Sequence, residues 1–149
     1  MNGELRQAME IVSVRILEDA AFLFVEPLAE EDKPDPDWIP TGAELGWSGP
    51  TRGTMRIWTD PDFLVLLAAN MLGIEEDDTA AAKAGPDALR EVLNMIVGNS
   101  LTEAWGPGPA FHLEIPEIAD PDLLSSDMSD GYWVDADNHP VLFWCGNQQ

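Results

Sequence analysis

The sequence has little of three residue types that often carry chemistry: one cysteine, two histidines and seven basic residues among 149. A single cysteine excludes an internal disulfide and a four-cysteine zinc site. Cys145 lies in an apolar run near the end of the chain, and we interpret it as a half-buried strand residue rather than a nucleophile. A chain without disulfides is typical of the cytoplasm, the compartment that we expect.

Long hydrophobic runs are also missing. A membrane helix needs roughly 18 consecutive apolar residues. The longest candidate, Phe63 to Met71, is much shorter and contains Asn70. The first residues show no basic segment followed by an apolar one, so we expect no signal peptide.

Positive charge is scarce, because 28 acidic residues against seven basic ones give a net charge of −21. Such a field repels nucleic acids and anionic membranes, and we expect neither as a partner. It favours a partner with some basic surface. The acidic runs Glu30–Asp32 and Glu75–Asp78 lack the alternating ligand spacing of a calcium loop, so we expect no metal site of the chain's own.

A chain of 149 residues, 45% of them hydrophobic, is long enough to bury a core, and we expect one domain over residues 1–149. Apolar periodicity and turn signals predict a mixture of helices and antiparallel hairpins. The sequence therefore predicts an α+β fold, an antiparallel sheet with helices packed on one face. The expected helices are Glu4–Leu17, Phe63–Leu72 after a start at Thr59-Asp60-Pro61, and one opened by Gly85-Pro86-Asp87 that runs to Trp105.

The expected strands form short segments separated by polar or proline-rich loops. Two loops are predicted, over 27–40 and 120–131, and Trp38 in the first is expected either to pack as an anchor or to serve exposed recognition. The strands are expected at 19–26, 43–48 with 54–59, 111–115, and 132–135 with 141–145.

The segment Asp87 to Leu101 is the most informative part of the chain. At about 100° per residue, Asp87, Glu91, Asn94 and Gly98 share one narrow stripe of the predicted helix. The opposite side carries large apolar residues. We therefore predict a helix that is held by its back and presents an ordered polar front.

The front of this helix offers a carboxylate beside a carboxamide. Glu91 and Asn94 are three residues apart, which places their Cβ atoms about 5–6 Å from each other. An amide both donates and accepts hydrogen bonds, so it can hold a water in line with a phosphorus atom. The carboxylate can pair with a lysine of a partner. Gly98 allows a partner backbone to approach closely, and Asp87 suits the first turn of the helix.

The pattern Asp87-x3-Glu91-x2-Asn94, continued by Met95-Ile96-Val97-Gly98-Asn99, resembles the signature of the CheC/CheX/FliY phosphatases of bacterial chemotaxis, and the CheX branch in particular. The order of the surrounding elements is similar too, including an N-terminal helix that leads into Ala20-Ala21-Phe22-Leu23-Phe24. A single copy of the motif is typical of CheX-like members. The acidic, proline-rich segment 26–40 is longer than a typical member needs.

The resemblance implies an enzyme that hydrolyses the aspartyl-phosphate of a CheY-like receiver in two-component signalling. By position, Glu91 would dock a lysine of the receiver, and Asn94 would enter its active site and orient the attacking water. Asp87, Glu91 and Gly98 would contact the partner. The magnesium ion would belong to the receiver, and the chain would have no cofactor of its own. A homodimer through the sheet is implied as well.

Two alternatives remain beside this hypothesis. A CheX-like module could bind a receiver, or a flagellar or signalling protein, without hydrolysing anything. A purely structural dimer is the other, and burial of both Glu91 and Asn94 would favour it.

Overall fold

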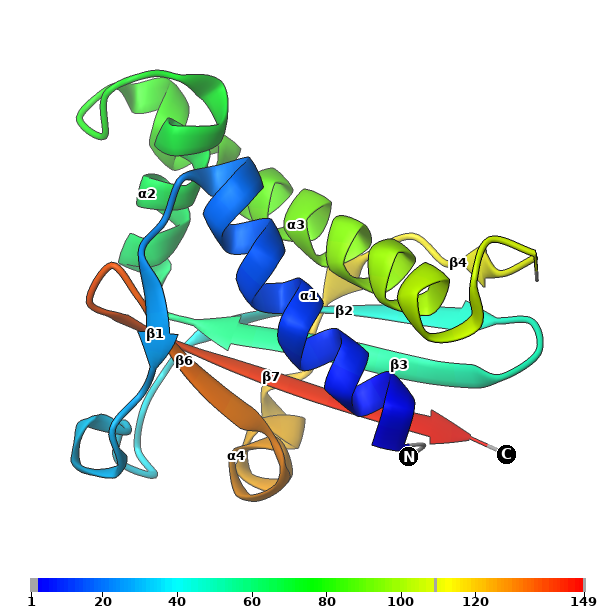
Figure 1. Cartoon of the computed structure of the whole chain (residues 1–149). Coiled ribbons are helices and arrows are strands. Elements are labelled where there is room, and N and C mark those ends of the chain that lie inside the picture. Colours follow the sequence, from blue (N-terminus) through cyan, green and yellow to red (C-terminus); the bar gives the residue numbers. More distant parts are fainter. Residues whose placement is uncertain (1–2, 109, 149) are drawn as a thin grey trace.

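Three helices lie across one face of an antiparallel sheet in the computed structural model, which describes residues 3–108 and 110–148 (Figure 1). The helices are α1 (Gly3–Ala21), α2 (Pro61–Leu72) and α3 (Thr79–Trp105). The strands follow the order β1-β6-β7-β3-β2-β4, and β5 also pairs with β2. The predicted α+β fold is confirmed. The strand bounds are β1 Val25–Pro27, β2 Thr41–Ser48, β3 Arg52–Thr59, β4 His112–Leu113, β5 Glu117–Ile118, β6 Tyr132–Ala136 and β7 His139–Gln148.

The main core lies between the sheet and the three helices. Alternate residues of each strand point to opposite faces. In β3 this directs Met55 and Ile57 to the helices, and in β7 it directs Phe143 and Cys145 there. Both hairpins were predicted, and the second turns through Asp137 and Asn138, whose positive φ angles of 45° and 70° suit a tight turn. None of the helices in the described part of the chain is long and apolar enough to cross a membrane.

The opposite face of the sheet is partly covered by a short helix, α4 (Leu124–Asp130), which follows a 3₁₀ turn, η2 (Pro121–Leu123). We predicted a polar loop here, and that prediction was wrong. The apolar residues Leu124 and Met128, one turn apart, pack toward Trp58. The aspartate and serine content of the segment hid this helix, because its main attachment is an ion pair with a distant strand.

That ion pair joins α4 to β3. The Arg56 guanidinium donates to both carboxylate oxygens of Asp127, at 2.7 and 3.0 Å, and the Trp58 indole donates to the same carboxylate at 2.9 Å. The guanidinium also lies 3.9 Å from the centre of the Trp144 ring. Burial acts to lower the pKa of Arg56, but the hydrogen bond and charge of Asp127 raise it overall. The arginine therefore stays charged under a helix that it holds in place.

The first helix is longer than predicted, so the strand expected at 19–26 is reduced to β1. The Leu23 amide donates to the Leu17 carbonyl at 3.2 Å across Phe22, whose left-handed φ of 55° ends the helix. The Asn70 amide donates to the Ala21 carbonyl at 2.8 Å and satisfies a second carbonyl of the last turn. These bonds extend the helix to residue 21.

The long helix α3 also begins earlier than predicted, at Thr79 rather than at Gly85-Pro86-Asp87. Asp78 caps it, because its carboxylate accepts from the Ala80 amide at 2.9 Å, and the alanines that follow favour a helix. Pro86 lies inside the helix and removes one backbone donor. Gly85 sits against α2, where an added Cβ would lie 2.9 Å from the Leu64 Cβ. We infer that close packing on α2 keeps the chain helical at Gly85 and Pro86, which the sequence alone marks as a helix start.

Two loop regions also differ in detail from the prediction. The strand expected at 111–115 is shortened to the two residues of β4, and β5 is a further two-residue strand that was not predicted; both pair with β2. The segment 27–40 contains one 3₁₀ turn, η1 (Glu30–Asp32). Trp38 packs as an anchor, since its indole donates to the Asp60 carboxylate at 2.7 Å and its ring lies 5.5 Å from that of Trp133.

Removing the partner of Arg56 should strongly destabilise the fold. We expect Asp127→Ala to lower the free energy of unfolding by about 3–5 kcal/mol, because the buried guanidinium loses its closest counter-ion and keeps only the partly exposed Glu44 carboxylate at 3.5 Å. Denaturant unfolding measures this loss. As control, the double variant Arg56→Met with Asp127→Leu removes both charges and should lose much less. An Asp127→Ala protein as stable as wild type would contradict the role of this ion pair.

The single cysteine should be inert in the folded protein. Cys145 is only 4% exposed, more deeply buried than the half-buried strand residue we expected, and burial raises the pKa of its thiol to about 12. At pH 8 the folded thiol therefore stays protonated, and we expect no reaction with an aromatic disulfide reagent until denaturant is added. Because the unfolded thiol deprotonates near pH 8.5, its contribution to stability is full below that pH and falls as pH rises toward 12. Rapid labelling of the native protein would contradict this.

Candidate functional site

The predicted site lies on α3, which is fixed by its apolar back. Leu89, Val92, Leu93 and Ile96 are at most 2% exposed and belong to the main core. They pack α3 against α1, α2 and the strands β2 and β3. The predicted back face of the helix is therefore confirmed, and the direction of the front face is set by the core.

The front of α3 faces the surface. Asp87, Glu91 and Asn94 are exposed, and Gly98 is half-buried. Within the described residues, neither the Glu91 carboxylate nor the Asn94 amide has a hydrogen bond or ion pair. Both groups are thus available to a partner. Their exposure argues against a purely structural dimer, the alternative that burial of both residues would have favoured.

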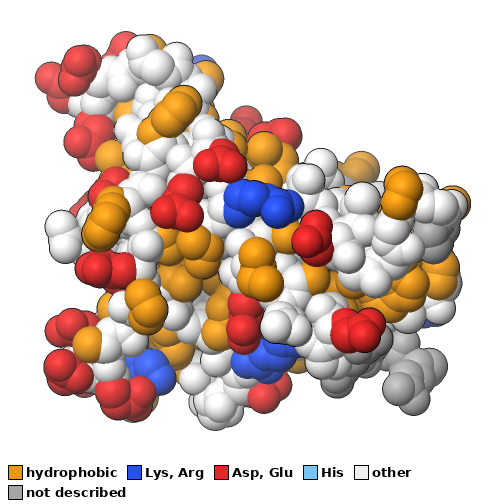
Figure 2. Space-filling view, in the orientation of Figure 1, with side chains coloured by type: hydrophobic (Ala, Val, Ile, Leu, Met, Phe, Trp, Pro, Cys, Tyr) orange, Lys and Arg blue, Asp and Glu red, His pale blue; other side chains and the backbone are white. Residues whose placement is uncertain are grey.

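Asp87 differs from its two neighbours because it already has a partner. Arg90 donates to its carboxylate at 2.8 Å, three residues along the helix. An exposed pair of this kind contributes little stability. The pair leaves a partly exposed guanidinium one turn before Asn94, a cation that the stripe analysis did not include. Cations are scarce on this chain, which has seven basic residues against 28 acidic ones, and Figure 2 shows the same excess of acidic side chains on the face it presents.

Polar side chains beyond Asn94 bond to the helix itself. The Asn99 amide donates to the Met95 carbonyl at 2.7 Å, and the Thr102 hydroxyl donates to the Gly98 carbonyl at 3.1 Å. Ser100 is fully buried, and its hydroxyl has no hydrogen-bond partner among the described residues.

A small open pocket lies beside Gly98, at the C-terminal end of the stripe. It measures about 230 Å³ and was not foreseen from the sequence, because half of its wall comes from the segment that folds back after α3 to form β4. All of its lining residues are uncharged. They are Gly98, Leu101, Thr102, Gly106, Pro107, Phe111 and Leu113.

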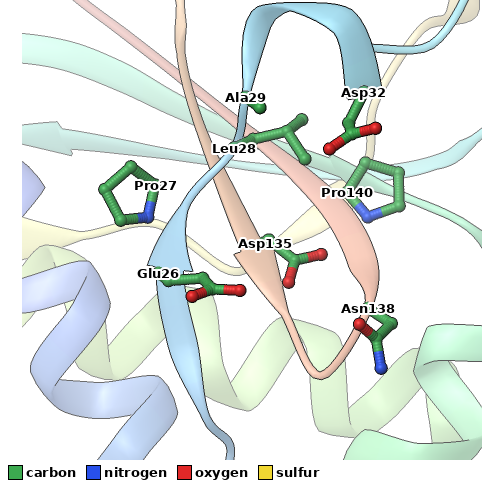
Figure 3. A pocket seen from close by; sticks show the side chains of 8 residues that line it. All are labelled: Glu26, Pro27, Leu28, Ala29, Asp32, Asp135, Asn138 and Pro140. Atoms are coloured by element: carbon green, nitrogen blue, oxygen red, sulfur yellow. The ribbon is translucent and has the colours of Figure 1, made fainter.

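A larger pocket of about 580 Å³ lies elsewhere, between β1, η1 and the β6–β7 turn (Figure 3). Its walls carry the carboxylates of Glu26, Asp32 and Asp135, and Figure 3 shows Asp135 between Glu26 and Asn138. Three carboxylates repel a phosphoryl group, and the predicted site residues do not line this pocket. Its size therefore does not make it a competitor for phosphate chemistry.

The chemistry open to the α3 stripe follows from its groups. A carboxylate and a carboxamide, held side by side on a rigid helix, can dock a cation and orient a water. In the described residues, no set of three or more histidine, cysteine, aspartate or glutamate side chains is arranged to hold a metal ion. The fold and the stripe together define a class of protein: an α+β domain that presents exposed polar groups from one helix whose other side is buried.

Comparisons with known proteins agree with this class. The family model described as chemotaxis phosphatase CheX matches residues 42–133, which are more than half of the chain and include the whole stripe. The chain therefore belongs to the CheX family of chemotaxis phosphatases. No curated protein matches the chain.

Solved structures share the fold at low sequence identity. CheX of Borrelia burgdorferi, in a complex with CheY, BeF₃ and Mg²⁺, is 19% identical with a TM-score of 0.68, over 96% of this chain and 97% of that one. A putative chemotaxis protein of Desulfovibrio vulgaris Hildenborough is 18% identical with a TM-score of 0.71, over 99% of each chain. CheX of Vibrio vulnificus is 18% identical with a TM-score of 0.65, over 98% of this chain and 100% of that one.

The two exposed site residues should be dispensable for folding. Asn94→Ala is expected to leave stability equal or raise it by about 0.5 kcal/mol, since alanine favours helices more than asparagine. Glu91→Gln should change it by less than about 0.5 kcal/mol. Thermal unfolding of both variants tests this. A loss above about 2 kcal/mol in either would assign that side chain to the fold instead of a partner.

Proposed function

We propose that this chain is a protein phosphatase that hydrolyses the aspartyl-phosphate of a CheY-like receiver, with residues 1–149 acting as one domain in the cytoplasm. Membership of the CheX family supports the reaction class. The observation that carries the proposal for these residues is that Glu91 and Asn94 are exposed side by side on a helix whose other side is buried.

In the proposed reaction, Asn94 enters the receiver's active site beside the phosphorus atom. Its amide oxygen accepts a hydrogen bond from a water and holds that water in line with the bond between phosphorus and the aspartate oxygen. The water oxygen bonds to phosphorus as the bond between phosphorus and the aspartate oxygen breaks, and both protons of the water end on the product phosphate. The receiver regains a free carboxylate. The chain supplies positioning, and the receiver supplies the Mg²⁺ that neutralises developing charge.

Glu91 has the docking role in this proposal. Its carboxylate, three residues before Asn94, pairs with a lysine of the receiver through a charge-assisted hydrogen bond. Asp87 and Gly98 contribute to the same contact surface. Because Arg90 engages Asp87, we assign Asp87 a smaller share of docking than Glu91.

We also propose that two copies pair through the sheet. Beyond Phe143, β7 pairs with β3 and with no second strand among those described, so its other edge keeps free backbone groups. Such an edge is a template for a strand of another chain.

The rate of receiver dephosphorylation tests the proposal. A phosphorylated CheY-like receiver with Mg²⁺ should decay faster with the wild-type chain, and Asn94→Ala should lower kcat by about 10²-fold or more, as removing a preorganised hydrogen bond does. Glu91→Gln should act mainly by raising KM. The Asp87→Asn variant serves as a matched exposed control with a small effect.

The outcomes separate the hypotheses. Full activity of Asn94→Ala would refute its water-positioning role. A wild-type chain that binds the phosphorylated receiver without shortening its lifetime would be a non-catalytic binding module instead.

A further inference from the structure

Gly98 is a glycine that the fold itself does not require. It lies inside α3 with ordinary helical φ, and a Cβ added there would meet only the Leu113 Cδ2, at an ordinary 3.8 Å. Gly85 of the same helix is different, because a Cβ there would press on Leu64 at 2.9 Å. Glycine in a helix interior is less stable than alanine. The internal packing of the described residues therefore gives no reason for glycine at position 98.

The space that Gly98 leaves open is part of the 230 Å³ pocket at the end of the stripe. Leu101, Phe111 and Leu113 line it, and the Trp105 ring braces Phe111 at 5.5 Å in an edge-on contact. The Thr102 hydroxyl is turned to the Gly98 carbonyl, so its proton is already used. The pocket is thus an uncharged site on a chain of net charge −21.

The pocket lies within reach of any partner that docks on Asn94. At 1.5 Å per residue, Gly98 is about 6 Å and Thr102 about 12 Å along the helix from Asn94. A standard interface covers about 800 Å² on each partner, which corresponds to a disc of roughly 16 Å radius. A receiver whose phosphorylated residue reaches Asn94 therefore covers the pocket as well.

We propose that this pocket receives an uncharged side chain from the surface of the receiver next to its phosphorylated aspartate. The inference rests on the proposed function and adds to it a determinant of partner choice. A phosphoryl group and the carboxylates that hold Mg²⁺ make the receiver surface acidic at this point. An acidic chain can approach such a surface most closely through an uncharged patch, and the missing side chain of Gly98 opens the entrance.

Substitutions at Gly98 test the inference through two opposite effects. Gly98→Ala should raise Tm by about 1–4 °C, because it removes a helix-interior glycine. Gly98→Leu places a side chain at the pocket entrance, and should weaken binding to a CheY-like receiver loaded with beryllofluoride and Mg²⁺ by about 10-fold or more. With phosphorylated receiver, KM should rise by a similar factor while kcat changes less than about twofold.

Ala82→Leu is the matched control. It adds the same side chain at an exposed position of α3, twelve residues before Asn94 and on the other side of the helix. Its affinity and KM should equal those of wild type. Asn94→Ala provides the complementary pattern, with lost turnover and retained binding.

Each other outcome overturns the inference. A lower Tm for Gly98→Ala would make the glycine structural, and wild-type affinity of Gly98→Leu would show that the pocket lies outside the contact. A Gly98→Leu protein that changes oligomeric state but keeps receiver affinity would assign the pocket to a contact between copies. If the wild-type chain neither binds nor dephosphorylates the receiver, the proposed function itself fails, a result distinct from failure at Gly98 alone.

Discussion

The contact between the apolar side of α3 and the core is the constraint on which the candidate site depends. Val92, Leu93, Ile96 and Val97 are fully buried, and each contributes roughly 1.5–3 kcal/mol by leaving water. A helix fixed in this way cannot rotate about its axis without exposing them. The exposed Glu91 and Asn94 are therefore held in one direction without any hydrogen bond of their own, and a water-positioning amide needs that kind of preorganisation.

The second face of the sheet is organised by charge instead of apolar area alone. Asp127 is fully buried and satisfied by Arg56 and Trp58, which lie on the face of β3 away from α3. The stability of this ion pair is thus separate from the geometry of the site. The buried ion pair is stable because both the guanidinium and the carboxylate have hydrogen-bond partners, so neither charge is left unpaired in a medium of low dielectric constant.

Electrostatics divides the surface of the chain into regions with different uses. The acidic pocket at Glu26, Asp32 and Asp135 and the acidic loops keep other anions away, which suits solubility. The front of α3 offers the Asp87–Arg90 ion pair, the carboxylate of Glu91, which is unpaired among the described residues, and an uncharged end near Gly98. A negatively charged partner is best accommodated at such a surface, because local pairing there replaces long-range attraction.

Much of the fold followed from local signals in the sequence. Turn residues and alternation indicated both hairpins, and a 3.6-residue period placed Asp87, Glu91 and Asn94 on one side of a helix, because these patterns depend on neighbours only a few positions away. The start of α3, the helix α4 and the pocket at Gly98 were not predictable in this way. Asp127 pairs with Arg56, which is 71 residues earlier in the chain, and the pocket beside Gly98 is completed by the segment that returns to the sheet at β4. The sequence by itself determined which side chains share the exposed face of α3; the tertiary structure alone decided what surrounds them, because those contacts join residues that only the folded sheet brings together.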